Sequence, residues 1–79
     1  MTVRQFLAMF TDEYYQSVNI YDSAENVSRE VVHNKCYDEF DDDDYQYLDM
    51  NIESIDTLYE PTKVLTLNVD SDMYYLPFN

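Results

Sequence analysis

The sequence predicts an α+β protein: an N-terminal helix packed on an antiparallel sheet of about four strands, with a short acidic helix or loop in the middle. Three observations lead to this prediction. Apolar residues recur at helical spacing near the N-terminus, later segments alternate as β-strands do, and an acidic run divides those segments. The 79 residues are 46% hydrophobic and 16% aromatic, which suits a single domain, 1–79, with a thin core.

The N-terminal helix is predicted within the first ten residues. Thr2 and Gln5 have the spacing of a capping box, in which the two side chains accept hydrogen bonds from free amides at the helix start. Four apolar residues then follow at i, i+3, i+4 and i+7, the spacing of one helical stripe. They are Val3, Phe6, Leu7 and Phe10.

Two β-hairpins are predicted from alternating segments. The first joins residues 14–22 to residues 27–33 through a polar turn, and the second joins residues 50–58 to residues 63–70. In the second turn, Pro61 occupies the position where its fixed φ suits a β-turn. The last strand alternates most clearly, so three of its side chains should face one side of the sheet: Leu65, Leu67 and Val69.

The middle and the end of the chain are less regular. We expect a loop from Cys36 into the aspartate run 41–44, followed by a short helix over residues 45–49. The aromatic tail, residues 73–79, either packs back on the domain or forms part of an interface. Because the chain has no Gly, Asn and Asp are expected in its tight turns.

Charge is the outlying property of the composition. Seventeen Asp and Glu face four Lys and Arg, so the net charge is −13. Such a chain is repelled by nucleic acids and anionic membranes, and its electrostatic complement is a basic protein surface. The single cysteine, Cys36, cannot form an internal disulfide, which favours a reducing compartment. With no signal-like or membrane-length apolar segment, the cytoplasm of a host cell is the expected location.

Residues 37–60 contain ten acidic residues and no basic one. Neighbouring side chains on a helix lie about 5–6 Å apart, so folded carboxylates can imitate the phosphates of a nucleic acid, and tyrosines can stack on arginine. The alternative interpretation is a solvated face that only keeps the protein soluble. The predicted partner-binding residues are Asp38, Glu39, Asp41, Asp42, Asp43, Asp44, Tyr45, Tyr47, Asp49, Glu53, Asp56 and Glu60.

Metal and catalytic sites are not predicted. Calcium loops use a Gly at their sharp turn, and this chain has none. His33 and Cys36 are three residues apart, but they are the only His and Cys, whereas zinc sites use four ligands. Acidic neighbours also oppose formation of a reactive thiolate at Cys36. We therefore expect no metal, no cofactor and no catalytic residue, and we do not expect an enzyme.

Three segments carry a resemblance to short proteins of phages and mobile elements of gut bacteria. They are residues 2–7, residues 18–22 and residues 65–69, read as helix, strand and final strand. In size and acidity the chain is also similar to phage-encoded DNA mimics, including anti-CRISPR proteins. That second resemblance implies an inhibitor whose carboxylates occupy the nucleic-acid channel of an effector.

Two functions from different classes remain open at this point. The first is a non-enzymatic inhibitor that binds a basic nucleic-acid-binding protein, such as a CRISPR effector, by imitating phosphates. The alternative is a structural or adaptor protein that forms a homodimer, or binds a partner, through a sheet edge or the aromatic tail. A small enzyme or metal-dependent regulator is a weaker third candidate.

Overall fold

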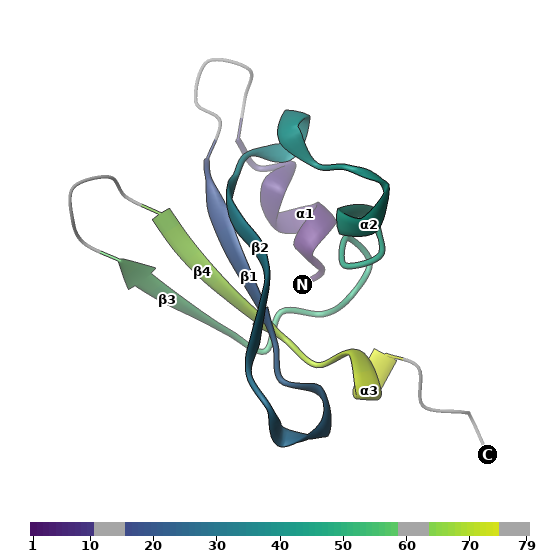
Figure 1. Cartoon of the computed structure of the whole chain (residues 1–79). Helices are drawn as coiled ribbons and strands as arrows, with labels where there is room; N and C mark the ends of the chain where they lie inside the picture. The colour runs from purple at the N-terminus through teal and green to yellow at the C-terminus, as the bar shows by residue number, and fades with distance from the viewer. Residues whose placement is uncertain (11–15, 59–63, 75–79) are drawn as a thin grey trace.

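The structure is a computed structural model that describes residues 1–10, 16–58 and 64–74. It confirms the α+β class, with short helices and a four-stranded sheet. Figure 1 shows α1 and α2 on the same face of that sheet. The elements are α1 (Val3–Leu7), β1 (Val18–Asp22), the 3₁₀ turn η1 (Ala24–Asn26), β2 (Arg29–Lys35), the 3₁₀ turn η2 (Tyr37–Glu39), α2 (Asp42–Tyr45), β3 (Ser54–Leu58), β4 (Val64–Val69) and α3 (Ser71–Tyr74).

Both predicted hairpins are confirmed, and the sheet has the strand order β2-β1-β4-β3. β1 pairs antiparallel with β2, and β3 pairs antiparallel with β4. The turn predicted around Pro61 lies outside the described residues, as do the beginning of the first predicted strand and most of the predicted tail.

The sheet is mixed, whereas an antiparallel sheet was predicted. Its two central strands, β1 and β4, are parallel, with Val18 opposite Leu65 and Ile20 opposite Leu67. The reason is the segment that contains η2 and α2, which crosses one face of the sheet from β2 to β3 (Figure 1). A crossover of this kind carries the chain from the end of β2 back to the end of the sheet at which β2 began, so β3 runs parallel to β2 and β4 runs parallel to β1.

The N-terminal helix is confirmed and is held by its cap and its packing. Gln5 donates its amide to the Thr2 hydroxyl at 3.1 Å, and Thr2 donates its amide to the Gln5 side chain at 2.9 Å. The helix covers only five residues, which is too short to be stable by itself. Its backbone is fixed further by hydrogen bonds from Val3 to Met50 and from Arg4 to Leu48.

The core lies between the helices and the sheet face that they cover. β4 contributes Leu67 and Val69, both fully buried, and Leu65 packs partly against the same cluster, as the alternation predicted. The members of the cluster are Val3, Phe6, Leu7, Val18, Ile20, Val32, Phe40, Leu48, Met50, Leu67 and Val69.

The predicted helix over residues 45–49 is wrong in its position, because the aspartate run itself forms the helix. α2 begins at Asp42 and ends at Tyr45. Asp41 and Asp44 form a capping box, so the run supplies both the cap and the first turn of α2. Carboxylates are favourable at this end of a helix because they accept hydrogen bonds from amides that have no partner within the helix.

Tight turns without glycine use residues with positive φ. Asn26, in the turn η1, has a φ of 60°, which agrees with the prediction that Asn fills such positions, whereas Asn34, with a φ of 49°, lies within β2. Glu25 also has a φ of 60°, although glutamate is not one of the residues expected there. The Glu25 amide is held by the Asp72 carboxylate at 2.8 Å, so α3 supports this conformation.

Candidate functional site

Five of the predicted acidic residues lie together on the crossover between β2 and β3. We call this group, Asp38, Glu39, Asp41, Asp42 and Asp43, the acidic segment; all five residues are exposed. Four of their carboxylates form no ion pair with any residue that the structure describes: those of Asp38, Glu39, Asp42 and Asp43. η2 and α2 thus present several uncompensated charges along a short length of chain.

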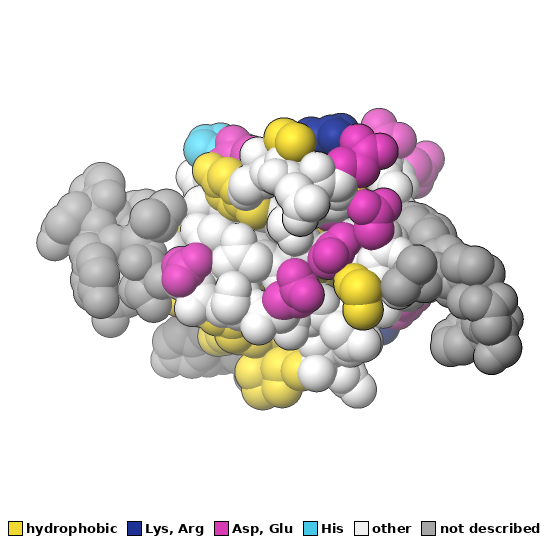
Figure 2. Space-filling model, turned by 90° about the horizontal axis from the view of Figure 1, so that it is seen from below, with side chains coloured by type: hydrophobic (Ala, Val, Ile, Leu, Met, Phe, Trp, Pro, Cys, Tyr) yellow, Lys and Arg dark blue, Asp and Glu magenta, His cyan; other side chains and the backbone are white. Residues whose placement is uncertain are grey.

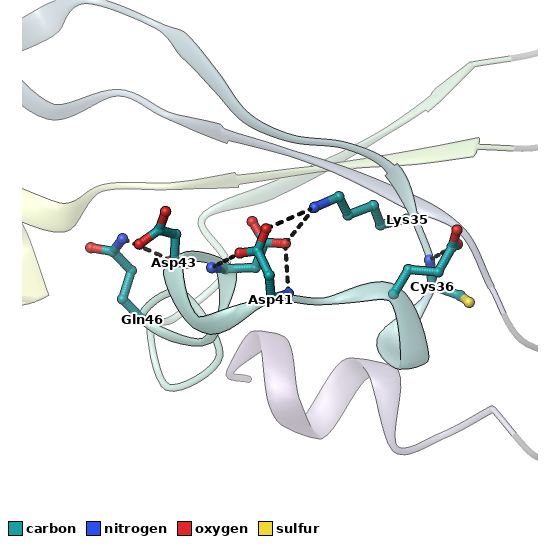
Figure 3. Close-up of polar contacts among 7 residues, drawn as sticks. Lys35, Cys36, Asp41, Asp43 and Gln46 are labelled. Carbon is teal, nitrogen blue, oxygen red and sulfur yellow. Dashed lines mark hydrogen bonds and ion pairs between the residues drawn. The ribbon is translucent and has the colours of Figure 1, made fainter.

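Asp44 differs from its neighbours because it is buried, with only 4% of its surface exposed. Its carboxylate accepts hydrogen bonds from the Lys35 ammonium at 2.7 Å and from the Asp41 amide at 3.1 Å. Figure 3 shows Lys35 extending from β2 toward Asp41, whose carboxylate lies 3.5 Å from the Lys35 nitrogen. Asp44 therefore joins α2 to the sheet and is not available to a partner, unlike the exposed acids predicted beside it.

These contacts change the pKa values of Lys35 and Asp41. The hydrogen bond from Lys35 to Asp44 raises the pKa of Lys35, although partial burial of the ammonium acts in the opposite direction. The amide of Asp44 lowers the pKa of the Asp41 carboxyl, and the nearby charge of Lys35 adds to that effect. Both groups are therefore held in their charged forms, which keeps the cap and the ion pair intact near neutral pH.

Glu39 and Cys36 form a second local cap at the start of η2. The Cys36 amide donates to the Glu39 carboxylate at 3.0 Å, and this contact lowers the pKa of Glu39. Burial of the Cys36 thiol and its hydrogen bond with Glu39 raise the pKa of Cys36. A thiol with a raised pKa is a weaker nucleophile near neutral pH because less of it is ionised.

The predicted tyrosines differ in their exposure. Tyr45 ends α2 with 46% of its surface exposed, whereas Tyr47 is half-buried against the core. Tyr37, which was not among the predicted contact residues, is 40% exposed and stacks on Phe40 with ring centroids 6.3 Å apart. Tyr37 and Tyr45 are therefore the exposed rings that border the acidic segment.

The remaining predicted residues do not join the acidic segment. Asp49 is already paired with Arg4, at 2.9 Å. Asp56 lies in β3 opposite Thr66, on the sheet face away from the helices, and its carboxylate accepts a hydrogen bond from Asn68 at 2.9 Å. Glu53 lies at the other end of the crossover, directly before β3. Glu60 lies outside the described residues.

Glu53 belongs to a second acidic group that the sequence analysis did not predict. Glu53 and Asp70 line a shallow pocket of about 250 Å³ together with Asn51 and Met73. Asp72 donates its amide to the Asp70 carboxylate at 3.0 Å. Glu25 adjoins this group because its backbone amide donates a hydrogen bond to the Asp72 carboxylate. Figure 2, a view from below, shows acidic side chains in a band across this face.

This second group, Glu25, Glu53, Asp70 and Asp72, is called the strand-end cluster. Its residues come from three separate parts of the chain. They lie near one another because β1 and β4 are parallel and therefore finish at the same end of the sheet, where β3 begins. Acidic residues at the ends of two strands were a visible signal in the sequence. The direction of those strands, which brings them together, was not.

Asp22 lies beside this cluster but has a structural role. Its buried carboxylate accepts hydrogen bonds from the amides of Ala24 and Ser71, each at 3.0 Å. Burial acts to raise the pKa of Asp22, but the hydrogen bonds from Ser71 and Ala24, together with the charge of Arg29, outweigh it and lower the pKa. Asp22 therefore connects the turn after β1 to the start of α3.

Each Lys and Arg among the described residues has an acidic partner. Arg4 pairs with Asp49, Arg29 pairs with Glu25 at 3.5 Å, and Lys35 binds Asp44. Lys35 also lies 3.5 Å from Asp41, and within the described part of the chain no Lys or Arg pairs with the other four carboxylates of the acidic segment.

Three further findings on the described residues concern the single histidine, metal binding and membrane-spanning helices. His33 lies in ion-pair geometry with Glu30, at 3.1 Å. In the part of the chain that the structure covers, no three His, Cys, Asp or Glu side chains are grouped so that they could hold a metal ion. None of the helices within that part is long and apolar enough to span a membrane.

No protein-family model, curated protein sequence or solved structure matches this chain. Its function is therefore inferred from the arrangement of its own residues. The acidic segment, with its exposed carboxylates and bordering tyrosines, is the candidate binding surface.

Proposed function

We propose that this protein is a non-enzymatic inhibitor that binds a basic nucleic-acid-binding protein, such as a CRISPR effector, in place of nucleic acid. One observation carries the proposal: the acidic segment is exposed, while every Lys and Arg in the described residues is already paired. Among the described Lys and Arg, only Lys35 pairs with this segment, through Asp41, so most of the segment's charge has no internal counter-charge and its field extends into solvent. A surface of this kind is attracted to sites that are built to hold phosphates.

The proposed contact surface is narrower than the predicted one. Asp38, Asp42 and Asp43 take the positions of phosphates, and Tyr37 and Tyr45 pack against Arg or Lys side chains of the partner. Lys35 and Asp44 hold α2 against the sheet, so that the exposed carboxylates keep one arrangement. A pre-arranged surface loses less conformational entropy on binding than a disordered acidic tail would.

The binding test uses a partner captured from host lysate after nuclease treatment and then purified. Displacement of fluorescently labelled DNA from that partner is measured by anisotropy. The double variant Asp42→Asn/Asp43→Asn should displace DNA about tenfold less effectively, because two exposed interfacial charges are lost. Binding should also weaken steeply between about 50 mM and about 200 mM NaCl.

The matched control removes two charges from the opposite end of β2. Glu25→Gln/Glu30→Gln changes the net charge by the same amount, and both exposed residues lie in η1 or at the start of β2, whereas the acidic segment follows the end of β2. This control should displace DNA nearly as well as the wild type. Equal losses for the two double variants would instead indicate a non-specific effect of net charge and would contradict the proposal.

A second candidate function is association with another protein through a sheet edge. It is favoured by Ile55, which has 46% of its surface exposed in the edge strand β3. An apolar side chain at an unpaired edge is a common feature of strands that accept another strand. Sedimentation of the purified chain over a range of concentrations tests the homodimer version of this candidate.

A further inference from the structure

The two edges of the sheet have different properties. β2 forms one edge and β3 forms the other. Within the described residues, β3 pairs only with β4 and β2 pairs only with β1. Each strand therefore has a row of backbone groups that could pair with an added strand, and side chains and regularity decide which edge is suitable.

The β2 edge is unsuitable for a further strand. Its pairing with β1 contains two register shifts, on either side of Ile20, which disturb the regular spacing of its backbone groups. Its side chains include charges of both signs, from Arg29 and Glu30 to Lys35. Irregular pairing and charged side chains are the devices by which proteins protect an edge.

The β3 edge has no irregular pairing, and Asp56 is the one charged residue in the strand. Its five residues pair with β4 in continuous register, and the strand contains no Lys, Arg or Pro. Ile55 lies opposite the buried Leu67, so it is on the helix-covered face of the sheet, yet it remains 46% exposed. A neighbouring apolar side chain on an added strand would cover Ile55 and extend the core cluster.

The charges around β3 indicate the partner. Asp56 is exposed near the centre of the strand, and the pocket with Glu53 and Asp70 lies where the strand begins. Met73 supplies an apolar wall to that pocket, which suits the aliphatic stem of a lysine or arginine. The described cations of the sheet, Arg29 and Lys35, are on the opposite edge strand.

From these observations we propose that β3 accepts an extended, basic segment of a partner protein as a fifth strand. Backbone hydrogen bonds supply the pairing, Ile55 receives an apolar side chain, and Asp56 and Glu53 receive basic ones. A second copy of this chain fits less well. Each copy carries a net charge of −13, and acidic strands placed side by side repel each other.

The test uses a short synthetic peptide in which Lys and Val alternate, added to the full chain. Amide hydrogen exchange measured by NMR should slow at residues 54–58. A fully N-methylated version of the peptide keeps its charge but cannot donate backbone hydrogen bonds, so it should not protect these amides. A peptide in which Glu replaces Lys should not bind.

A matched pair of variants separates the edge from general charge. Ile55→Lys and Val27→Lys each replace an exposed aliphatic residue with a cation, but Val27 lies between η1 and β2. Ile55→Lys should weaken peptide binding about tenfold, as expected for a charge placed on a pairing edge, and Val27→Lys should change it little.

Three results would overturn this proposal. Equal protection by the N-methylated peptide would indicate charge attraction without strand pairing. Protection confined to residues 38–43 would place the peptide on the acidic segment. Protection of residues 54–58 that appears without peptide and grows with protein concentration would identify a second copy as the occupant.

Discussion

Consecutive aspartates in the run 41–44 have different environments, although they are chemically identical. Asp41 caps α2, Asp42 and Asp43 are exposed, and Asp44 is buried against Lys35. Successive residues of a helix are rotated by about 100°, so a run of four necessarily points both toward the protein and away from it. A run of acids in a sequence therefore overstates the charge that a partner can contact.

Removal of the Lys35 charge should be costly because it leaves a buried carboxylate without its cation. Lys35→Met should lower the free energy of unfolding by about 2–3 kcal/mol, measured by urea denaturation. The control, Arg29→Met, breaks an exposed pair and should cost less than about 0.5 kcal/mol. Equal stability of the two variants would show that the contact between Lys35 and Asp44 does not hold α2.

The elements are short and depend on contacts with one another more than on their own propensity. α1 and α2 cover five and four residues, and each begins with a capping box. α3 is fixed at its start by Asp22, which also closes the turn after β1. Because one carboxylate serves both elements, its ionisation should affect them together.

The lowered pKa of Asp22 predicts a pH-dependent contribution to stability. A carboxyl whose pKa is lower in the folded state stabilises the fold above its unfolded pKa of about 3.9 and loses this effect as pH falls through the folded pKa. Asp22→Asn should therefore be less stable than the wild type by about 1 kcal/mol near pH 7, because charged acceptors make the stronger hydrogen bonds.

Urea denaturation at about pH 7 and about pH 3 measures this difference. The difference between the wild type and Asp22→Asn should be smaller at the lower pH, because the contribution of the carboxylate is lost progressively as pH falls through the folded pKa of Asp22. Asp22→Ala has lost the acceptor itself and should remain destabilised at both values. If the stability difference between the wild type and Asp22→Asn stayed constant across this pH range, the lowered pKa of Asp22 would be contradicted.

At the scale of the whole molecule, the net charge of −13 opposes the compact state. The described ion pairs are few and mostly exposed, so they offset little of this repulsion. Salt screens repulsion between exposed charges and should therefore stabilise this protein.

The melting temperature should rise by about 5 °C between about 20 mM and about 500 mM NaCl, as followed by circular dichroism. The variant Asp42→Asn/Asp43→Asn has a smaller net charge, so its rise should be smaller. An unchanged or lower melting temperature in salt would mean that attractive pairs outweigh the repulsion.

Local features were predictable where the sequence contains a local signal. The capping box of α1, its apolar stripe and both hairpins depend on neighbouring residues, and the structure confirms them. The position of α2 was missed because aspartate disfavours helix interiors, and the capping role of Asp41 and Asp44 moves the helix into the run. Within the candidate site, the five residues of the acidic segment were among those predicted and are exposed, but the sequence did not distinguish the buried Asp44 from them.

The sequence by itself determined that this is an α+β chain with a dominant negative charge and a concentrated acidic stretch. Composition and short-range periodicity contain that information. Only the tertiary structure decided that β1 and β4 are parallel, that the strand-end cluster forms, and that β3 is the less protected edge. These features depend on the crossover between β2 and β3, because its direction brings together residues that no local pattern connects.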